Sequence, residues 1–204
     1  MPDHPSAQTD RFVHDRLPPQ EQWPELRYDL PELQALPKQL NVVQALFDRA
    51  FAAGHADRPL FRSDERTLSY AQARAEVNRF AHVLTGMGLQ PGNRVLLRGG
   101  NTVEMALAWL GTVYAGLVAV ATMPLLRAVE LGSIIDRAQP TLALCDGRLL
   151  AELQTAQAQH PVLATIVPLL IAPYTSTRMP MARVVGTALA STAMPSTLKR
   201  VGPE

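Results

Sequence analysis

Segments with the apolar spacing of helices alternate with short apolar runs typical of strands over residues 40–167. The strands are expected at 94–97, 117–121, 141–144 and 162–167, with connections of only a few residues between elements. Strand–helix–strand units joined in this way form right-handed crossovers in a parallel sheet. The sequence therefore predicts an α/β fold with a mainly parallel sheet flanked by helices.

Prolines divide the chain into three parts. Seven of the 17 prolines precede Lys38 and five follow Val167, so only five fall between them. Because proline fixes φ and removes a backbone donor, we expect an extended Pro-rich arm over 1–39 and an irregular tail over 168–204. Three aromatic side chains are available to hold the arm against the body: Phe12, Trp23 and Tyr28.

Turn and capping residues set the expected bounds of the other elements. Asn41 is a suitable cap for a helix over 42–53, and Ser69 with Gln72 forms a capping box before a helix that ends near Gly86 or Gly88. Asn101 with Glu104 opens the next helix, which Gly116 ends. The remaining expected elements are two short strands at 59–62 and 66–68 and helices at 128–138 and 148–159.

Composition excludes several classes of function. A net charge of +1 gives no electrostatic reason to bind nucleic acid or anionic membrane. The single cysteine, Cys145, rules out an internal disulfide and fits a cytoplasmic location, and the five scattered histidines indicate no metal site. The uncharged stretch 105–126 is long enough to span a membrane. A helix that stops at Gly116 and passes into a buried strand explains the same residues and is favoured.

Candidate ligand-binding residues lie where the predicted strands end, because parallel sheets bind ligands at their carboxyl edge. Gly99, Gly100 and Asn101 enter a helix, so they could present backbone donors to an anion, or form only a tight turn. Arg127 could approach a phosphate or be a solvated arginine at a helix start. Two side chains end the third strand: Asp146, which favours a capping role over a contact with ribose, and Cys145, which favours a core position.

Two short motifs and their surroundings resemble a known enzyme superfamily. The stretch 67–72 (TLSYAQ) looks like the first core motif of the adenylate-forming acyl- and aryl-CoA synthetases, and 113–120 (VYAGLVAV) resembles the second. Four further stretches are similar to benzoate-CoA and 2-aminobenzoate-CoA ligases: 12–19, 97–101, 120–127 and 143–146. The resemblance covers about 10–167. It implies the first part of the large N-terminal domain of an adenylate-forming enzyme.

The resemblance also implies a chemistry, in which an aromatic acid is joined to coenzyme A through an acyl-adenylate, with Mg²⁺ and ATP. That chemistry needs a Gly/Ser/Thr-rich loop with a lysine, of the type Y-T-S-G-T-T-G-x-P-K-G, to hold the departing phosphates. Tyr174, Thr175 and Ser176 match three letters of it, but no glycine or lysine follows at the required place. The only lysines are Lys38 and Lys199. No catalytic or metal-binding residue can be assigned.

We therefore expect an N-terminal fragment of an aromatic-acid–CoA ligase that is inactive by itself and binds no cofactor. A frameshift near Val167 and a truncated gene both explain the loss of family motifs in the tail. Two alternatives stay open: a small stand-alone Rossmann-like nucleotide-binding module using Gly99, Gly100 and Asn101, and a single-span membrane protein. The residues do not decide which aromatic acid is used. Apolar surface left uncovered in a partial domain also predicts self-association.

Overall fold

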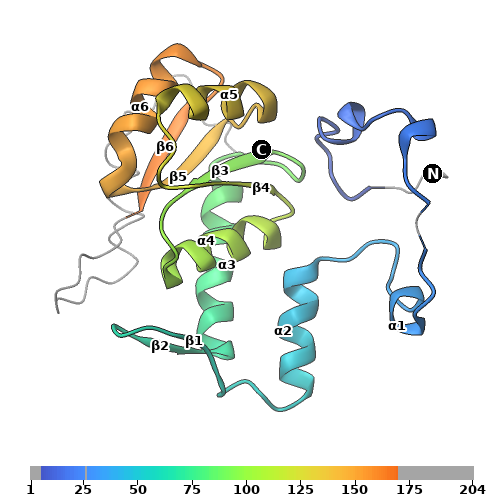
Figure 1. The fold of residues 1–204 in the computed structure, drawn as a ribbon. Helices are drawn as coiled ribbons and strands as arrows, with labels where there is room; N and C mark the ends of the chain where they lie inside the picture. Colours follow the sequence, from blue (N-terminus) through green and yellow to red (C-terminus); the bar gives the residue numbers. More distant parts are fainter. Residues whose placement is uncertain (1–5, 26, 170–204) are drawn as a thin grey trace, which may run out of the picture.

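A four-stranded parallel sheet organises the computed structural model, which describes residues 6–25 and 27–169 (Figure 1). Its strands are β3 (Arg94–Arg98), β4 (Val118–Thr122), β5 (Leu142–Asp146) and β6 (Thr165–Leu169), in the order β4-β3-β5-β6. All three strand pairs are parallel. The α/β fold with a parallel sheet flanked by helices is confirmed. Apart from Pro168 and Leu169, which belong to β6, the predicted tail lies outside the described residues.

Helices cover both faces of the sheet. α3 (Tyr70–Gly86) and α4 (Val103–Tyr114) pack on one face, and α5 (Ala128–Ala138) and α6 (Leu150–Gln159) pack on the other (Figure 1). A short 3₁₀ turn, η3 (Gly147–Leu149), precedes α6. Strand order reverses between β3 and β5, so the crossovers through α4 and α5 lie on opposite faces. This is a doubly wound arrangement, in which ligands bind beyond the carboxyl ends of the strands at the reversal.

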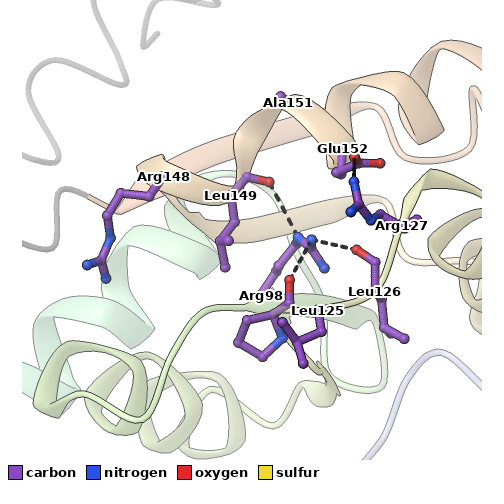
Figure 2. A pocket seen from close by; sticks show the side chains of 9 residues that line it. Arg98, Leu125, Leu126, Arg127, Arg148, Leu149, Ala151 and Glu152 are labelled. Atoms are coloured by element: carbon purple, nitrogen blue, oxygen red, sulfur yellow. Dashed lines mark hydrogen bonds and ion pairs between the residues drawn. The ribbon is translucent and has the colours of Figure 1, made fainter.

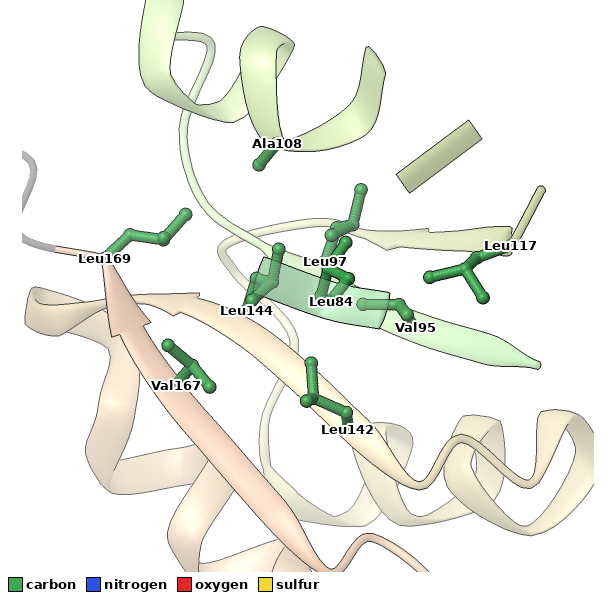
Figure 3. Packing of buried hydrophobic residues seen from close by; sticks show 9 residues of the cluster. All are labelled: Leu84, Val95, Leu97, Ala108, Leu117, Leu142, Leu144, Val167 and Leu169. Atoms are coloured by element: carbon green, nitrogen blue, oxygen red, sulfur yellow. The ribbon is translucent and has the colours of Figure 1, made fainter. Parts of the chain in front are cut away.

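Alternate residues of each strand enter two separate hydrophobic cores, as the period of two in a β-strand requires. Val95 and Leu97 of β3 face α3 and α4, in the core drawn in Figure 3. Leu96 faces the other way, toward α5 and α6, together with Ala143 and Cys145 of β5. All five residues of β3 and all five of β5 are buried, which fits the continuous apolar runs expected of central parallel strands.

A smaller unit precedes the sheet. It consists of α2 (Val42–Ala52) and an antiparallel pair, β1 (Pro59–Arg62) with β2 (Thr67–Ser69), packed through a third core against α3 and α4. The predicted capping box is confirmed: Ser69 Oγ accepts from the Gln72 amide at 3.3 Å, and Gln72 Oε1 accepts from the Ser69 amide at 2.9 Å. Asn41 caps α2 as predicted, since its Oδ1 accepts from the amide of Gln44.

The N-terminal arm is less extended than its prolines suggested. Three one-turn helices interrupt it: η1 (His14–Arg16), η2 (Gln20–Gln22) and α1 (Pro31–Gln34). Pro31 begins α1, a position where its missing N–H costs nothing. Of the three aromatic side chains considered as anchors, only Phe12 is seen against the body, over Arg94; Trp23 donates to Pro18 within the arm, and Tyr28 is exposed.

For residues 101–126 one expectation needs correction, and the favoured interpretation of 105–126 as a helix followed by a strand is confirmed. Thr102, not Asn101, caps α4, because the Thr102 hydroxyl accepts from the amide of Met105. The uncharged stretch 105–126 is not one span: α4 ends at Tyr114, Gly116 turns the chain with φ 77°, and β4 follows. None of the helices in the described part of the chain is long and apolar enough to cross a membrane.

Candidate functional site

The end of β3, the loop after β4 and the segment from η3 into α6 meet at the carboxyl edge of the sheet, on the side covered by α5 and α6. They surround an open hollow of about 230 Å³ (Figure 2). Its wall contains three arginines and one carboxylate, together with apolar loop and helix residues: Arg98, Pro124, Leu125, Leu126, Arg127, Arg148, Leu149, Ala151 and Glu152. Three cations favour an anionic ligand. Whether the hollow can bind one depends on whether each arginine already has a partner within the protein.

Arg98 is the cation at the base of the hollow, and its side chain is almost fully buried, with 1% of the residue exposed. Its guanidinium donates to four backbone carbonyls: Met123 at 3.1 Å, Pro124 at 3.0 Å, Leu126 at 2.8 Å and Leu149 at 3.4 Å. Three of these carbonyls belong to the loop between β4 and α5, and the fourth precedes α6. Figure 2 draws the bonds to Leu126 and Leu149. Arg98 therefore fixes the loops around the hollow rather than pointing a free charge into it.

Arg127 stands at the start of α5 and is largely solvated, with 78% of its side chain exposed. It pairs with Glu152 of α6 at 3.1 Å, and the other oxygen of Glu152 accepts from the amide of Ala128 at 2.9 Å. The bond from the Ala128 amide, followed by the one from Arg127, lowers the pKa of Glu152. The carboxylate thus links the start of α5 to α6 and neutralises the arginine.

Arg148 also has a carboxylate partner. Asp146 at the end of β5 has a nearly buried side chain, and its Oδ2 lies 2.6 Å from Nη2 of Arg148. Oδ1 of Asp146 accepts from the amide of Arg148 at 3.0 Å, so the carboxylate caps η3. The side-chain bond from Arg148 lowers the pKa of Asp146 despite the opposing effect of burial. Asp146 takes the capping role that the sequence favoured.

Cys145 lies one residue earlier on β5, in the core beneath α5 and α6. It is fully buried, and burial raises the pKa of its thiol to about 12. A thiol in this state is not a nucleophile at neutral pH, because the thiolate is the reactive form.

Gly99 and Gly100 form the turn from β3 to the start of α4. A Cβ added at Gly99 would overlap the terminal methyl of Met105 and lie 3.7 Å from Cβ of Asp146, whereas one added at Gly100 would meet nothing within 4 Å. Asn101 is exposed and does not cap the helix. The terminal methyl of Met105 therefore lies directly beside Gly99, close to the end of β5.

The described residues do not fit ATP with its metal ion. Among them, no three His, Cys, Asp or Glu side chains are grouped closely enough to hold a metal. Lys38, in the arm before α2, is the only lysine that the structure describes, and Lys199 lies outside the described residues. The three arginines at the hollow are already paired with carbonyls or carboxylates.

Sequence reasoning missed two residues of this edge, Arg98 and Glu152. Arg98 was read as part of the loop after β3, but β3 continues through it and gives its side chain a buried position. The available signal was an arginine at each end of a short apolar strand, Arg94 and Arg98, an even number of residues apart and hence on one face. Glu152 carried no such signal, since its partners come from another helix.

Comparisons with known proteins identify the family. Residues 48–183 match the model of the AMP-binding enzyme family, a stretch that runs past Val167 and covers more than half of the chain. The chain is 27% identical over 127 residues to a 4-hydroxybenzoate–CoA/benzoate–CoA ligase of Rhodopseudomonas palustris, covering 62% of this chain and 24% of the relative. It is 39% identical over 85 residues to a salicyl-AMP ligase/salicyl-S-ArCP synthetase of Mycobacterium tuberculosis, covering 42% of this chain and 14% of the relative.

Solved structures show the same fold. An anthranilate CoA ligase in complex with anthranoyl-AMP matches with a TM-score of 0.65 and 21% identity, over 82% of this chain and 31% of that one. A benzoate CoA ligase from Burkholderia xenovorans matches with a TM-score of 0.60 and 23% identity, over 78% of this chain and 31% of that one. The chain spans about a quarter of the first relative and less than a third of these structures. It belongs to the AMP-binding enzyme family.

Proposed function

We propose that this chain supplies the first part of the adenylating domain of an aromatic-acid–CoA ligase, and that its 204 residues alone form no acyl-adenylate. The substrates of the complete enzyme would be coenzyme A and an aromatic carboxylate of the benzoate or 2-aminobenzoate class. Support for this class comes from the names of the relatives: a benzoate–CoA ligase, a salicyl-AMP ligase, and the anthranilate CoA ligase whose fold matches.

The observation that carries the proposed inactivity is the state of the arginines at the carboxyl edge. Forming an acyl-adenylate requires fixed positive charge and backbone donors around the phosphates, an electrostatic contribution of about 3–4 kcal/mol for each well-placed donor. Arg98 donates hydrogen bonds to four carbonyls, and Arg127 and Arg148 each form an ion pair with a carboxylate. Each of the three arginines that the structure describes at this hollow therefore has a partner within the protein.

A second consideration is the crevice where strand order reverses, which would serve a stand-alone nucleotide-binding module. In such a module a glycine allows the phosphate to approach the backbone. Here the space over Gly99 holds the side chain of Met105, and the cap of α4 is the hydroxyl of Thr102. No specific observation favours the module over the partial ligase domain.

Calorimetric titration separates these two functions. We expect no saturable heat when Mg-ATP, AMP or NAD is added to the purified chain at millimolar concentration. A full-length ligase, such as the R. palustris relative, titrated with Mg-ATP and its acid in the same buffer serves as the positive control. Saturable binding at micromolar affinity by this chain would overturn the proposal and support the module.

If a nucleotide does bind, two variants locate it. Gly100→Ala places a methyl group in open space at the turn and disturbs only a ligand on that backbone, whereas Arg127→Met removes the exposed cation of the hollow. Loss of binding in the first alone would indicate the Gly99–Gly100 turn, and loss in the second alone would indicate the hollow.

A further inference from the structure

Residues 8–12 of the arm contact the body at a single turn, residues 91–94, just before and at the start of β3. The amides of Thr9 and Asp10 both donate to the carbonyl of Pro91, at 3.0 and 2.9 Å. At Gly92, whose φ is 92°, an added Cβ would overlap the carbonyl oxygen of Asp10. The arm backbone therefore lies directly on this turn, at the amino end of the sheet, opposite the hollow.

Asp10 joins this contact through its side chain. One carboxylate oxygen accepts from the amide of Phe12 at 2.8 Å, and the other accepts from Nδ2 of Asn93 at 2.8 Å and pairs with Arg94. Arg94 is nearly buried, with its guanidinium carbon 4.0 Å from the centre of the Phe12 ring. A charged pair shielded by an aromatic ring is stronger than an exposed one, since less water screens it.

Arg94 has other partners that do not depend on the arm. Its Nε donates to Ala138 at 2.9 Å and its Nη2 to Gln139 at 3.1 Å, both carbonyls at the end of α5, and its Nη1 also donates to Gly92 at 3.2 Å. If the arm left, the guanidinium would keep these three carbonyls and face water where Phe12 had been. The body loses no core residue with the arm, because η1, η2 and α1 contain no buried residue.

The next part of the arm, residues 18–34, forms hydrogen bonds within itself. Trp23 donates to Pro18, Arg27 to Glu25, and Gln34 to the carbonyl of Tyr28, all within the arm. Figure 1 shows this part of the chain, drawn in blue, beside the sheet rather than within a layer of it.

We propose that residues 8–16 form a strap that can detach from the body while the sheet and its helices stay folded. The strap is held by the clasp, a name used here for the contacts of the Asp10 side chain with Asn93 and Arg94. Release would expose the turn at 91–94 and the guanidinium of Arg94. The strap is thus a local opening unit with its own stability, distinct from global unfolding.

Hydrogen exchange followed by mass spectrometry on the 204-residue chain tests this. Asp10→Asn keeps an oxygen that can accept from the amide of Phe12, but it removes the acceptor for both Arg94 and Nδ2 of Asn93, so it tests the side-chain contacts of Asp10 with the body. We expect the amides of Thr9, Asp10 and Phe12 to exchange at least about 10-fold faster in this variant, while peptides from β3 and α5 keep wild-type rates within about 2-fold. Phe12→Ala should act in the same direction. Asp15→Asn, which alters only exposed contacts with Arg11 and His14 inside the arm, is the matched control and should change neither region.

Two results would overturn the strap. Unchanged exchange at residues 9–12 in Asp10→Asn would show that the clasp does not hold the arm. Faster exchange in β3 and α5 together with the arm, with a matching loss of helical circular dichroism, would show that the arm is an integral part of the fold.

Discussion

Arg94 and Arg98 are the two buried arginines of the sheet, one at each end of β3 and both on the face toward α5. Arg94 donates to the carbonyls that end α5, and Arg98 donates to the carbonyls of the loop that leads into it. The two side chains thus fix α5 at both ends. Their even spacing in a strand places them on one face, so a simple sequence period produces the arrangement.

Arg98→Met should lower the free energy of unfolding by about 2–4 kcal/mol, because four partly buried carbonyl bonds are lost and methionine replaces none of them. Arg127→Met, at an exposed position in the same hollow, should cost less than about 1 kcal/mol. Urea unfolding followed by circular dichroism measures both values. Equal effects of the two substitutions would contradict the structural role of Arg98.

Cys145 should be unreactive toward a disulfide reagent in the folded chain, because it is fully buried and its pKa is raised to about 12. We expect a rate that stays low from pH 7 to about pH 10 and rises by several orders of magnitude in denaturant. Absorbance of the released thiolate reports the reaction. Rapid, stoichiometric labelling in native buffer would show that the core beneath α5 and α6 is open.

At the scale of elements, local sequence signals predicted most of the fold. The Ser69–Gln72 capping box and the glycines and prolines between the elements predicted the bounds of α3, β3, α4 and β4 to within one or two residues. Sequence signals failed where the conformation of a residue depends on a contact with a residue far away in the sequence. Gln139 ends α5 in the left-handed region, at φ 49°, where glycine or asparagine is usual, and its carbonyl accepts from Arg94 on β3. The pairing of Asp10 with Arg94 joins residues that no local pattern connects.

The candidate site was less predictable than the fold. Sequence placed the loops at the carboxyl edge correctly but could not show that Met105 lies over Gly99, since that contact depends on the packing of α4. It also left Arg98 in a loop. The contact of Met105 arises from tertiary packing and has no spacing that a sequence pattern could reveal, whereas the even spacing of Arg94 and Arg98 was an available signal for Arg98.

Ser69→Ala should destabilise the chain by about 1 kcal/mol, since the amide of Gln72 loses its acceptor at the start of α3. Ser133→Ala is the matched control: its hydroxyl donates only to Val129 one turn earlier in α5 and is exposed, so the change should lie within about 0.5 kcal/mol of zero. Thermal or urea unfolding of the pair tests this. If Ser133→Ala cost as much as Ser69→Ala, the capping box would not be what stabilises α3.

At the scale of the whole molecule, many large apolar side chains remain exposed, and two groups of them lie close together in the sequence. One group lies in the loop before α5 and at its start, where Leu125 is 83% and Val129 is 79% exposed. The other is in the arm and consists of Leu30, Leu33, Leu36 and Leu40. Apolar surface in such patches favours association. The cytoplasmic location inferred from the single cysteine stays a prediction.

The purified chain should therefore self-associate as its concentration rises from micromolar to about 100 micromolar, and its melting transition should be broad. Leu125→Gln combined with Val129→Gln should reduce the association, because both changes remove exposed apolar area without touching a core residue. Light scattering after size-exclusion chromatography measures the mass. A monodisperse chain with a sharp, cooperative melt would contradict this expectation.

The central claim is that the chain has the fold of an AMP-binding enzyme without the means to adenylate an acid. Exchange of labelled pyrophosphate into ATP measures adenylate formation directly and needs no coenzyme A. With benzoate or 2-aminobenzoate, Mg²⁺ and ATP, we predict no exchange above that of buffer, because the three arginines described at the carboxyl edge are already paired with carbonyls or carboxylates. Acid-dependent exchange by the purified 204-residue chain would contradict the account.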